Sequence, residues 1–249
     1  MRPSIGPSIG HWTRDWAEAR ALPCEFHEST GSTNDLAREN GPHRDGLMAV
    51  APLALYVADA QTAGRGRGGR AWQTAAPGSS LLSTWSFDMP LSPQPILSPL
   101  VGLSLFRALR GAFPELALSL KAPNDVWSGP AKVAGVLIET VEVGARRRSA
   151  IGIGLNVWAA PESPDFAAAA LVASATELTP LAWFGFLDTL HEGLRGAVGA
   201  GQGQTLVPEA RRALRDALNL RPGLEERVLE VGSQGELSTS GGLVRWQDL

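Results

Sequence analysis

The chain has 249 residues, room for one large or two small domains, and 44% of them are hydrophobic, which is enough for a substantial core. Its formal net charge of -3 argues against a general binder of polyanions, and its single cysteine, Cys24, excludes an internal disulfide and a cysteine-based metal cluster. No signal-like segment follows Met1 and no apolar run is long enough for a membrane span, so we expect a cytoplasmic protein without nucleic-acid or membrane partners.

The first elements predicted along the chain are two short helices. Trp12 and Trp16 stand at i, i+4 spacing, which predicts a helix laid on the body of the protein. A second helix is expected to be capped near Ser32 or Thr33 and to stop at Gly41. The hydroxyl groups at its start suit either a ligand site or an ordinary N-cap, and these residues alone favour the N-cap.

The most unusual stretch comes next, and we call residues 64–72 the arginine loop. The apolar run Leu53–Ala58 predicts a buried strand that leads into the loop, and Ser80–Phe87 predicts a strand that follows it. Glycine lets the backbone approach a ligand closely, and arginine carries donor forks suited to phosphate or carboxylate. The glycines are Gly64, Gly66, Gly68 and Gly69, and the arginines are Arg65, Arg67 and Arg70. An anionic ligand, first of all a phosphate ester, is therefore the working hypothesis.

A helix with a core-facing stripe and three strands are predicted in the middle of the chain. Ser98 is the expected N-cap of the helix, and apolar residues recur every four positions from 97 to 109. The strands are expected at residues 116–120, 132–143 and 149–157. The three arginines at 146–148 are expected at a solvent-exposed tip of the hairpin that joins the last two strands.

The C-terminal third predicts two helices and a small β module. Thr179-Pro180 predicts the start of the first helix, and His191 on its apolar face is interpreted as a core or boundary residue, not a ligand. The second helix is expected at residues 208–218. Pro222-Gly223 predicts a boundary between a domain of residues 1–220 and a β module of residues 221–249 with three short strands.

Three familiar motifs resemble the arginine loop without fitting it. Gly64, Gly66 and Gly69 have the spacing of the dinucleotide fingerprint, but that motif needs a helix starting within the loop, and Pro77-Gly78 follows too soon. A P-loop would need a Lys-Ser/Thr pair after the glycines. An Arg/Gly RNA-binding tail would be repeated and disordered, not set between two strands. The remaining interpretation is that the arginine loop is a mobile lid over a phosphate-bearing ligand.

Lysine usage points to a second group of residues. Of the 22 basic residues only Lys121 and Lys132 are lysines, so these two positions are candidates for a compact charge that a planar guanidinium would not replace. Two surface lysines left by chance are an equally good explanation until their neighbours are considered.

Five sequence motifs in register, two of which contain these lysines, make it less probable that the lysines are there by chance. They are Ser32-Thr-Asn34, Gln61 to Trp72, Lys121-Ala-Pro-Asn-Asp125, Lys132-Val-Ala-Gly-Val-Leu137 and Gly152-Ile-Gly-Leu-Asn156. Together they resemble the catalytic domain of biotin protein ligases over roughly residues 25 to 160, and residues 223–249 resemble a shortened form of the family's C-terminal β-barrel. The resemblance implies an α+β fold: a mixed, mostly antiparallel sheet with flanking helices and a small C-terminal β-barrel-like appendage.

The resemblance also implies an activity and a role for each motif. Such enzymes join biotin to ATP, with Mg²⁺ accompanying the ATP, and pass the biotinyl group from biotinyl-5'-AMP to a lysine of a biotin carboxyl carrier domain. The implied catalytic residues are Lys132, Arg67 and Asp125. The implied biotin-binding residues are Ser32, Thr33, Asn34, Gln61, Arg65, Gly66, Arg67 and Lys132. The implied nucleotide-binding residues are Arg67, Arg70, Trp72, Lys121, Asn124 and Asn156, and no metal-ligand cluster is implied.

One position departs from the family pattern, and alternatives stay open. The family usually has Trp where this chain has Ala122, a change beside Asp125 that bears on activity and substrate choice, and Trp127 is a candidate replacement. A lipoate or octanoate ligase-like acyltransferase and a non-catalytic biotin- or nucleotide-binding homologue are the alternatives. No N-terminal helix-turn-helix domain is expected, hence no operator binding, and a homodimer is left open.

Overall fold

A seven-stranded sheet organises the molecule in the computed structural model, which describes residues 8–39, 54–89, 93–143, 146–163, 166–172 and 177–249. The strand order is β1-β2-β3-β7-β6-β5-β4, with β1 parallel to β2 and every other neighbouring pair antiparallel. The strands are β1 (Cys24–His27), β2 (Ala54–Ala58), β3 (Ser80–Met89), β4 (Leu118–Lys121), β5 (Asp125–Ser128), β6 (Ala131–Val143) and β7 (Arg146–Asn156).

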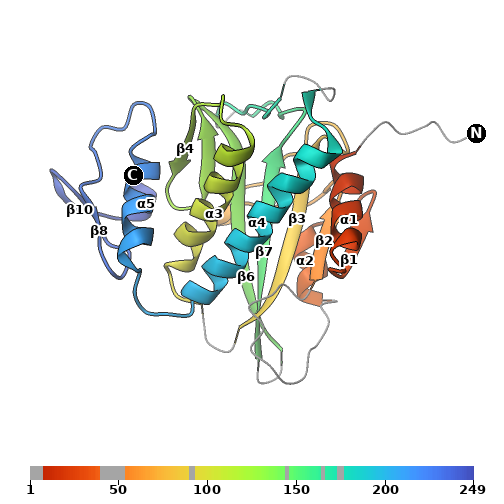
Figure 1. Cartoon of the computed structure of the whole chain (residues 1–249), viewed down its shortest axis with the longest axis horizontal. Helices are drawn as coiled ribbons and strands as arrows, with labels where there is room; N and C mark the ends of the chain where they lie inside the picture. The colour runs from red at the N-terminus through yellow and green to blue at the C-terminus, as the bar shows by residue number, and fades with distance from the viewer. Residues whose placement is uncertain (1–7, 40–53, 90–92, 144–145, 164–165, 173–176) are drawn as a thin grey trace, which may run out of the picture.

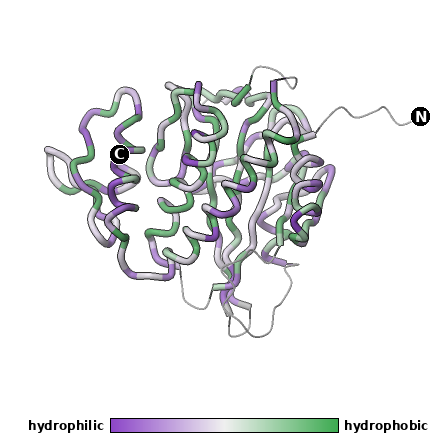
Figure 2. Tube along the Cα trace, in the orientation of Figure 1, coloured by the Kyte–Doolittle hydropathy of each residue, from purple (hydrophilic) through white to green (hydrophobic). Residues whose placement is uncertain are grey.

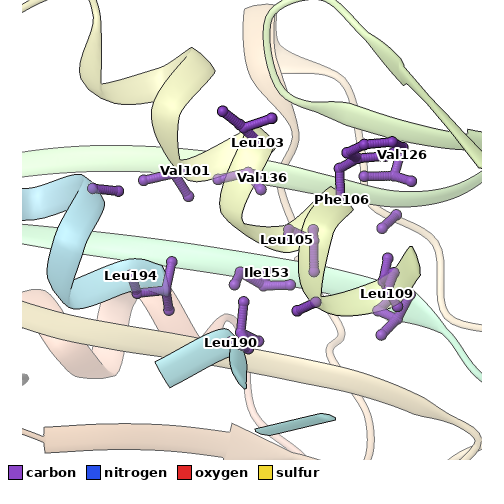
Figure 3. Packing of buried hydrophobic residues seen from close by; sticks show 14 of the residues in the cluster. Val101, Leu103, Leu105, Phe106, Leu109, Val126, Val136, Ile153, Leu190 and Leu194 are labelled. Atoms are coloured by element: carbon purple, nitrogen blue, oxygen red, sulfur yellow. The ribbon is translucent and has the colours of Figure 1, made fainter. Parts of the chain in front are cut away.

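Three helices cover one face of this sheet: α1 (Ile9–Ala19), α3 (Leu97–Ala112) and α4 (Pro180–Ala200), with α3 and α4 side by side (Figure 1). Hydrophilic and hydrophobic residues alternate along these helices (Figure 2), as expected for helices that bury one side. Figure 3 shows the result, with Leu105 of α3 and Leu190 of α4 packed toward Val136 and Ile153 of the sheet. This layer contains most of the hydrophobic core.

In the described part of the chain, the other face of the sheet carries one short helix, α2 (Thr33–Glu39). Leu55 and Val57 of β2 belong to the main core, whereas Ala54 and Tyr56 pack with Ala37 of α2 in a separate small cluster. Because successive strand residues point to opposite faces, α2 lies on the side away from α1, α3 and α4. The remainder of that second face is left uncovered by helices among the described residues.

The chain ends in a small appendage at the opposite end of the molecule from α1 (Figure 1). Helix α5 (Pro208–Leu218) precedes an antiparallel sheet of β8 (Glu230–Val231), β9 (Leu237–Thr239) and β10 (Gly242–Val244), followed by a 3-10 turn at Trp246–Asp248. The apolar side chains of β8 and β9 join the same hydrophobic core as the large sheet. The division into two domains at residue 220 stays a prediction.

The predicted elements are largely confirmed, including both helices near the N-terminus, the α+β class and the three C-terminal strands. The expected end of the second helix at Gly41 lies outside the described residues. Thr179 caps α4 as expected, accepting a hydrogen bond from the backbone N–H of Ala182 at 3.2 Å. Helix α3 differs: it begins at Leu97 with Ile96 at the N-cap position, so Ser98 lies inside its first turn. Strand β5 was not predicted, because four residues between a turn and a glycine give too short a pattern.

The arginine triplet is the clearest correction. Residues 146–148 belong to β7, and Arg148 is only 2% exposed, so the predicted solvent-exposed tip is wrong for this residue. Its guanidinium donates a hydrogen bond to the carbonyl oxygen of Ala37 at the end of α2, 3.3 Å away. The strand begins three residues before its predicted start at residue 149, and this places the guanidinium of Arg148 under α2, where a backbone carbonyl accepts its hydrogen bond.

Candidate functional site

A cavity of about 710 Å³ lies on the face of the sheet that carries α2. In β7, Ile151, Ile153 and Leu155 contribute to the main core, while the alternate positions Gly152 and Gly154 face the opposite side. The space above those glycines is occupied by side chains from other elements. A Cβ atom on Gly152 would lie 2.4 Å from Oδ1 of Asn34, and one on Gly154 would lie 2.3 Å from the ring of Trp72. Glycine is therefore required here for close approach.

The sequence-predicted site residues converge on this cavity, with one exception. The predicted residues that line it are Ser32, Thr33, Asn34, Gln61, Arg65, Gly66, Arg67, Arg70, Trp72, Lys121, Asn124, Asp125 and Lys132. Asn156 does not line it. That side chain is buried at the end of β7 and donates a hydrogen bond to the carbonyl of Ala169 at 3.3 Å.

One end of the cavity is a hydrogen-bonded network of polar side chains around the start of α2. Gln61 Oε1 accepts hydrogen bonds from the backbone N–H and the hydroxyl of Thr33, at 2.8 and 3.2 Å. Asn34 accepts a bond from Thr84 at 2.6 Å and donates one to Glu139 at 2.7 Å. These bonds fix the side-chain orientations before any ligand arrives, which suits a ligand head group with both donors and acceptors.

The arginine loop folds as a narrow turn over the cavity. Arg65 and Ala71 form an antiparallel bridge, the N–H of Gly66 donates to the carbonyl of Arg70 at 2.7 Å, and the N–H of Trp72 donates to Gly64 at 2.9 Å. At the tip, Gly68 and Gly69 have φ values of 66° and 77°, in the left-handed region that favours glycine. No α-helix follows within the described residues of this segment, so the rejection of the dinucleotide fingerprint is confirmed.

Arg65 ties this loop to the body of the protein. Its guanidinium donates two hydrogen bonds to Asp35 of α2, at 2.9 and 2.7 Å, and one to Glu139 of β6 at 3.1 Å. The hydrogen bonds from Arg65 lower the pKa of Asp35 below its ordinary value. They likewise raise the pKa of Arg65, so the guanidinium stays charged.

Lys132 stands at the centre of the cationic part of the cavity. Its Nζ lies 2.8 Å from Oδ2 of Asp125, 5.5 Å from the ring of Trp72 and 5.3 Å from the ring of Phe166. The Lys132 side chain is 15% exposed, so its charge faces the cavity and not bulk solvent. Arg67, a second cation that lines the same cavity, donates a hydrogen bond to Oδ1 of Asn124 at 3.2 Å.

The outer wall is formed by the β4–β5 hairpin. Nζ of Lys121 lies 4.5 Å from the ring centre of Trp127, and burial lowers the pKa of Lys121, with the charge of Arg221 acting in the same sense. Ala122 also lines this wall, followed by a cis bond to Pro123. Trp127 lines the same cavity as Ala122, and its role as a replacement for the family's tryptophan stays a prediction.

Phe166 is a cavity residue that sequence reasoning missed. It belongs to the irregular connection after β7, where a run of Ala, Pro and Ser gave no periodic signal. A parallel bridge between Lys132 and Ala168 brings this segment to the cavity. Contacts of that kind depend on the tertiary fold and leave no local pattern in the sequence.

Other chemically capable residues lie elsewhere. Burial raises the pKa of the Cys24 thiol to about 12, so it behaves as a small apolar residue. His191 packs against the rings of Trp85 and Trp16 at 5.8 and 5.7 Å, in agreement with a boundary position. No group of three His, Cys, Asp or Glu side chains suited to a metal ion occurs in the described part of the chain. Among the same residues, no helix is long and apolar enough to cross a membrane.

Fold and site together define a binding cavity in a mixed sheet, polar at one end and cationic at the other. Solved structures with this fold include a biotin protein ligase from Aquifex aeolicus in complex with biotin and ATP (TM-score 0.63, 22% identity, covering 89% of this chain and 94% of that one). A biotin protein ligase from Leishmania major in complex with biotinyl-5-AMP is similar as well (TM-score 0.58, 23% identity, 90% and 98% covered).

Sequence comparison identifies the family. The model of the biotin/lipoate A/B protein ligase family matches residues 29–156, and the chain belongs to this family. A biotin--[acetyl-CoA-carboxylase] ligase from Mycobacterium tuberculosis is 38% identical over 143 residues, covering 55% of this chain and 50% of the relative. A Paracoccus denitrificans ligase of the same description is 36% identical over 139 residues, covering 51% and 55%. The chain therefore spans about half the length of these relatives.

Proposed function

We propose that this protein is an ATP-dependent biotin protein ligase that forms biotinyl-5'-AMP and transfers the biotinyl group to a lysine of a biotin carboxyl carrier domain. The observation that carries the proposal is one cavity that joins the polar network of Thr33 and Gln61 to the cations Arg67 and Lys132. Biotin has the matching parts, an uncharged ureido head with donors and acceptors and a carboxylate tail. A cytoplasmic setting, with ATP at hand, fits the proposal.

Biotin and ATP would share the cavity end to end. Ser32, Thr33, Asn34 and Gln61 would hold the ureido and ring end of biotin, and the tail would run toward Lys132. The nucleotide would lie along the arginine loop and the hairpin wall, near Arg67, Arg70, Trp72, Lys121 and Asn124, with the backbone of Gly66 over the junction. Asn156 lies away from the cavity and would act indirectly, by holding the segment that contains Ala169 through its side-chain hydrogen bond.

Activation then uses the cations at the junction. A carboxylate oxygen of biotin attacks the α-phosphorus of ATP, the bond to the β-phosphate oxygen breaks, and pyrophosphate leaves. Lys132 and Arg67 would offset the charge that develops on the phosphoryl oxygens. Arg65 is paired with Asp35 and Glu139, so a contact from its guanidinium to the biotin carboxylate requires that pair to open. Mg²⁺ would enter with the ATP phosphates, because the described residues offer no ligand cluster of their own.

Transfer requires a neutral amine. An unperturbed lysine has a pKa of about 10.4 and is almost wholly protonated at neutral pH. Asp125 would orient the incoming ammonium group and accept its proton, after which the amine attacks the acyl carbon and AMP leaves. The carboxylate lies at the cavity beside Lys132, which supports this role.

The family also contains lipoate ligases, so a lipoate or octanoate substrate is the second candidate. The test incubates the protein with ATP, Mg²⁺ and biotin, lipoate or octanoate in turn, and measures pyrophosphate and acyl-AMP. Biotin-dependent pyrophosphate followed by labelling of a carrier domain is the expected result. Release with lipoate or octanoate alone would favour the second candidate, and biotin binding without pyrophosphate would indicate a non-catalytic homologue.

A further inference from the structure

Phe166 reaches the cationic centre of the cavity from outside the sheet. Its ring centre lies 5.3 Å from Nζ of Lys132, within the range of an attractive contact between a cation and an aromatic face. Trp72 makes a similar contact at 5.5 Å, and Asp125 forms an ion pair with this ammonium group at 2.8 Å. Lys132 is therefore surrounded by two rings and one carboxylate.

Backbone hydrogen bonds hold the Phe166 segment directly on Lys132. The N–H of Lys132 donates to the carbonyl of Ala167 at 2.8 Å, and the N–H of Ala169 donates to the carbonyl of Lys132 at 2.9 Å. The same segment is held from the other side by Asn156, whose side chain donates to the carbonyl of Ala169 and whose carbonyl accepts from Leu171 at 3.0 Å. The position of Phe166 is thus coupled to the main chain of the residue it contacts.

An aromatic ring suits this place for a chemical reason. Lys132 has three N–H donors, and Asp125 occupies one direction. A hydrogen-bonding neighbour would take another donor, whereas the face of Phe166 attracts the charge and leaves the remaining donors for an anionic ligand. Gly135 also restricts the position of the Lys132 ammonium group, because a Cβ atom at residue 135 would lie only 3.0 Å from Nζ of Lys132.

We propose that Phe166 is a positioning residue that holds the Lys132 ammonium group toward the cavity through its ring face. The structural half of this inference is independent of the activity, and the kinetic half rests on the proposed function. Leucine at position 166 keeps apolar bulk without the ring, and tyrosine keeps the ring. The two substitutions therefore separate a cation–ring contact from simple filling of space.

The structural half is tested by NMR on protein labelled with ¹³C-lysine, because a chain with two lysines gives two sets of lysine signals. A Lys132→Arg variant assigns the set that disappears. In the Phe166→Leu variant, the ε-methylene signal of Lys132 should move toward its position in free lysine, while that of Lys121 stays. The Phe166→Tyr variant should keep the wild-type position. Unchanged Lys132 signals in Phe166→Leu would overturn the inference, whatever the activity of the protein.

The kinetic half is tested by biotin-dependent pyrophosphate release. Phe166→Leu should lower kcat roughly 3- to 30-fold, with KM for biotin changed less than about twofold, and Phe166→Tyr should restore most of the loss. The matched control is Phe184→Leu, which removes a similar contact, with Arg20 at 5.5 Å, far from the cavity. Equal kcat for the Leu and Tyr variants would contradict the inference, whereas no pyrophosphate from the wild type would contradict the proposed function instead.

Discussion

Asp125 and Lys132 form an ion pair within the cavity, and each side chain restricts the orientation of the other. Both are mostly buried, so the 2.8 Å contact is screened less than a pair on the surface. Asp125 also holds the Lys132 ammonium beside the position where we place the reacting phosphorus. The pair therefore sets the direction of a cation before substrates bind, which is the condition for strong electrostatic catalysis.

Replacing Lys132 with alanine should stop activation without unfolding the protein. The loss of one charged donor to the developing phosphoryl charge costs on the order of 10²- to 10³-fold in rate. Single-turnover formation of biotinyl-5'-AMP measures the effect, and circular dichroism checks the fold. Arg107→Ala, at an exposed position on α3, serves as the control. A Lys132→Ala rate within a few-fold of wild type would remove this residue from its assigned role.

The Arg65–Asp35 pair predicts a pH dependence of stability. The folded-state pKa of Asp35 is lowered by the hydrogen bonds of Arg65, so the pair stabilises the fold above the ordinary aspartate pKa of about 3.9. That contribution is lost as the pH falls through the lowered pKa. Because both side chains are about one third exposed, the contribution of the pair to the free energy of unfolding is limited to about 0.5–1 kcal/mol.

Urea unfolding measures this contribution. The free energies of unfolding of wild type and Asp35→Asn should differ by this amount at pH 7 and converge well below pH 4. A difference independent of pH would contradict the assignment.

At the scale of elements, the arginine loop combines a fixed base with an exposed tip. Gly64 is buried and Arg65 is paired, whereas residues 67 to 70 are exposed. Trp72 closes the base by packing on Gly154, where no side chain would fit. Such a loop can admit substrates at its tip and exclude water from a hydrolysable mixed anhydride once it closes.

Limited trypsin digestion tests this division of the loop. Without ligand, cleavage after Arg67 and Arg70 should be faster than cleavage after Arg65, because a protease needs an exposed, deformable segment. With biotin and ATP together, all three cleavages should slow at least several-fold. Mass spectrometry of the fragments identifies each cut. Equal rates with and without the two ligands would argue against closure of the loop over the adenylate.

At the scale of the whole molecule, sequence reasoning succeeded where chemistry or periodicity is local. The i, i+4 apolar stripes predicted α3 and α4, and the five motifs that resemble biotin protein ligases predicted most of the cavity. It failed where partners come from distant segments. Arg148 resembled a hairpin tip because its partner, the carbonyl of Ala37, lies on another element. Phe166 gave no signal because the residue it contacts, Lys132, lies in a distant part of the sequence. Tertiary contacts of this kind override local propensity.

The shared hydrophobic core predicts that the C-terminal sheet and the large sheet unfold together. Leu237 of β9 is fully buried in the cluster that includes α3 and α4, while Leu243 of β10 is 80% exposed in the same small sheet. Leu237→Ala should cost about 2–5 kcal/mol and lower the single calorimetric transition of the whole protein by roughly 5–15 °C. Leu243→Ala should stay within about 0.5 kcal/mol of wild type. Two transitions in the Leu237→Ala variant, with only the smaller one moved, would show instead that residues 221–249 unfold as a separate domain.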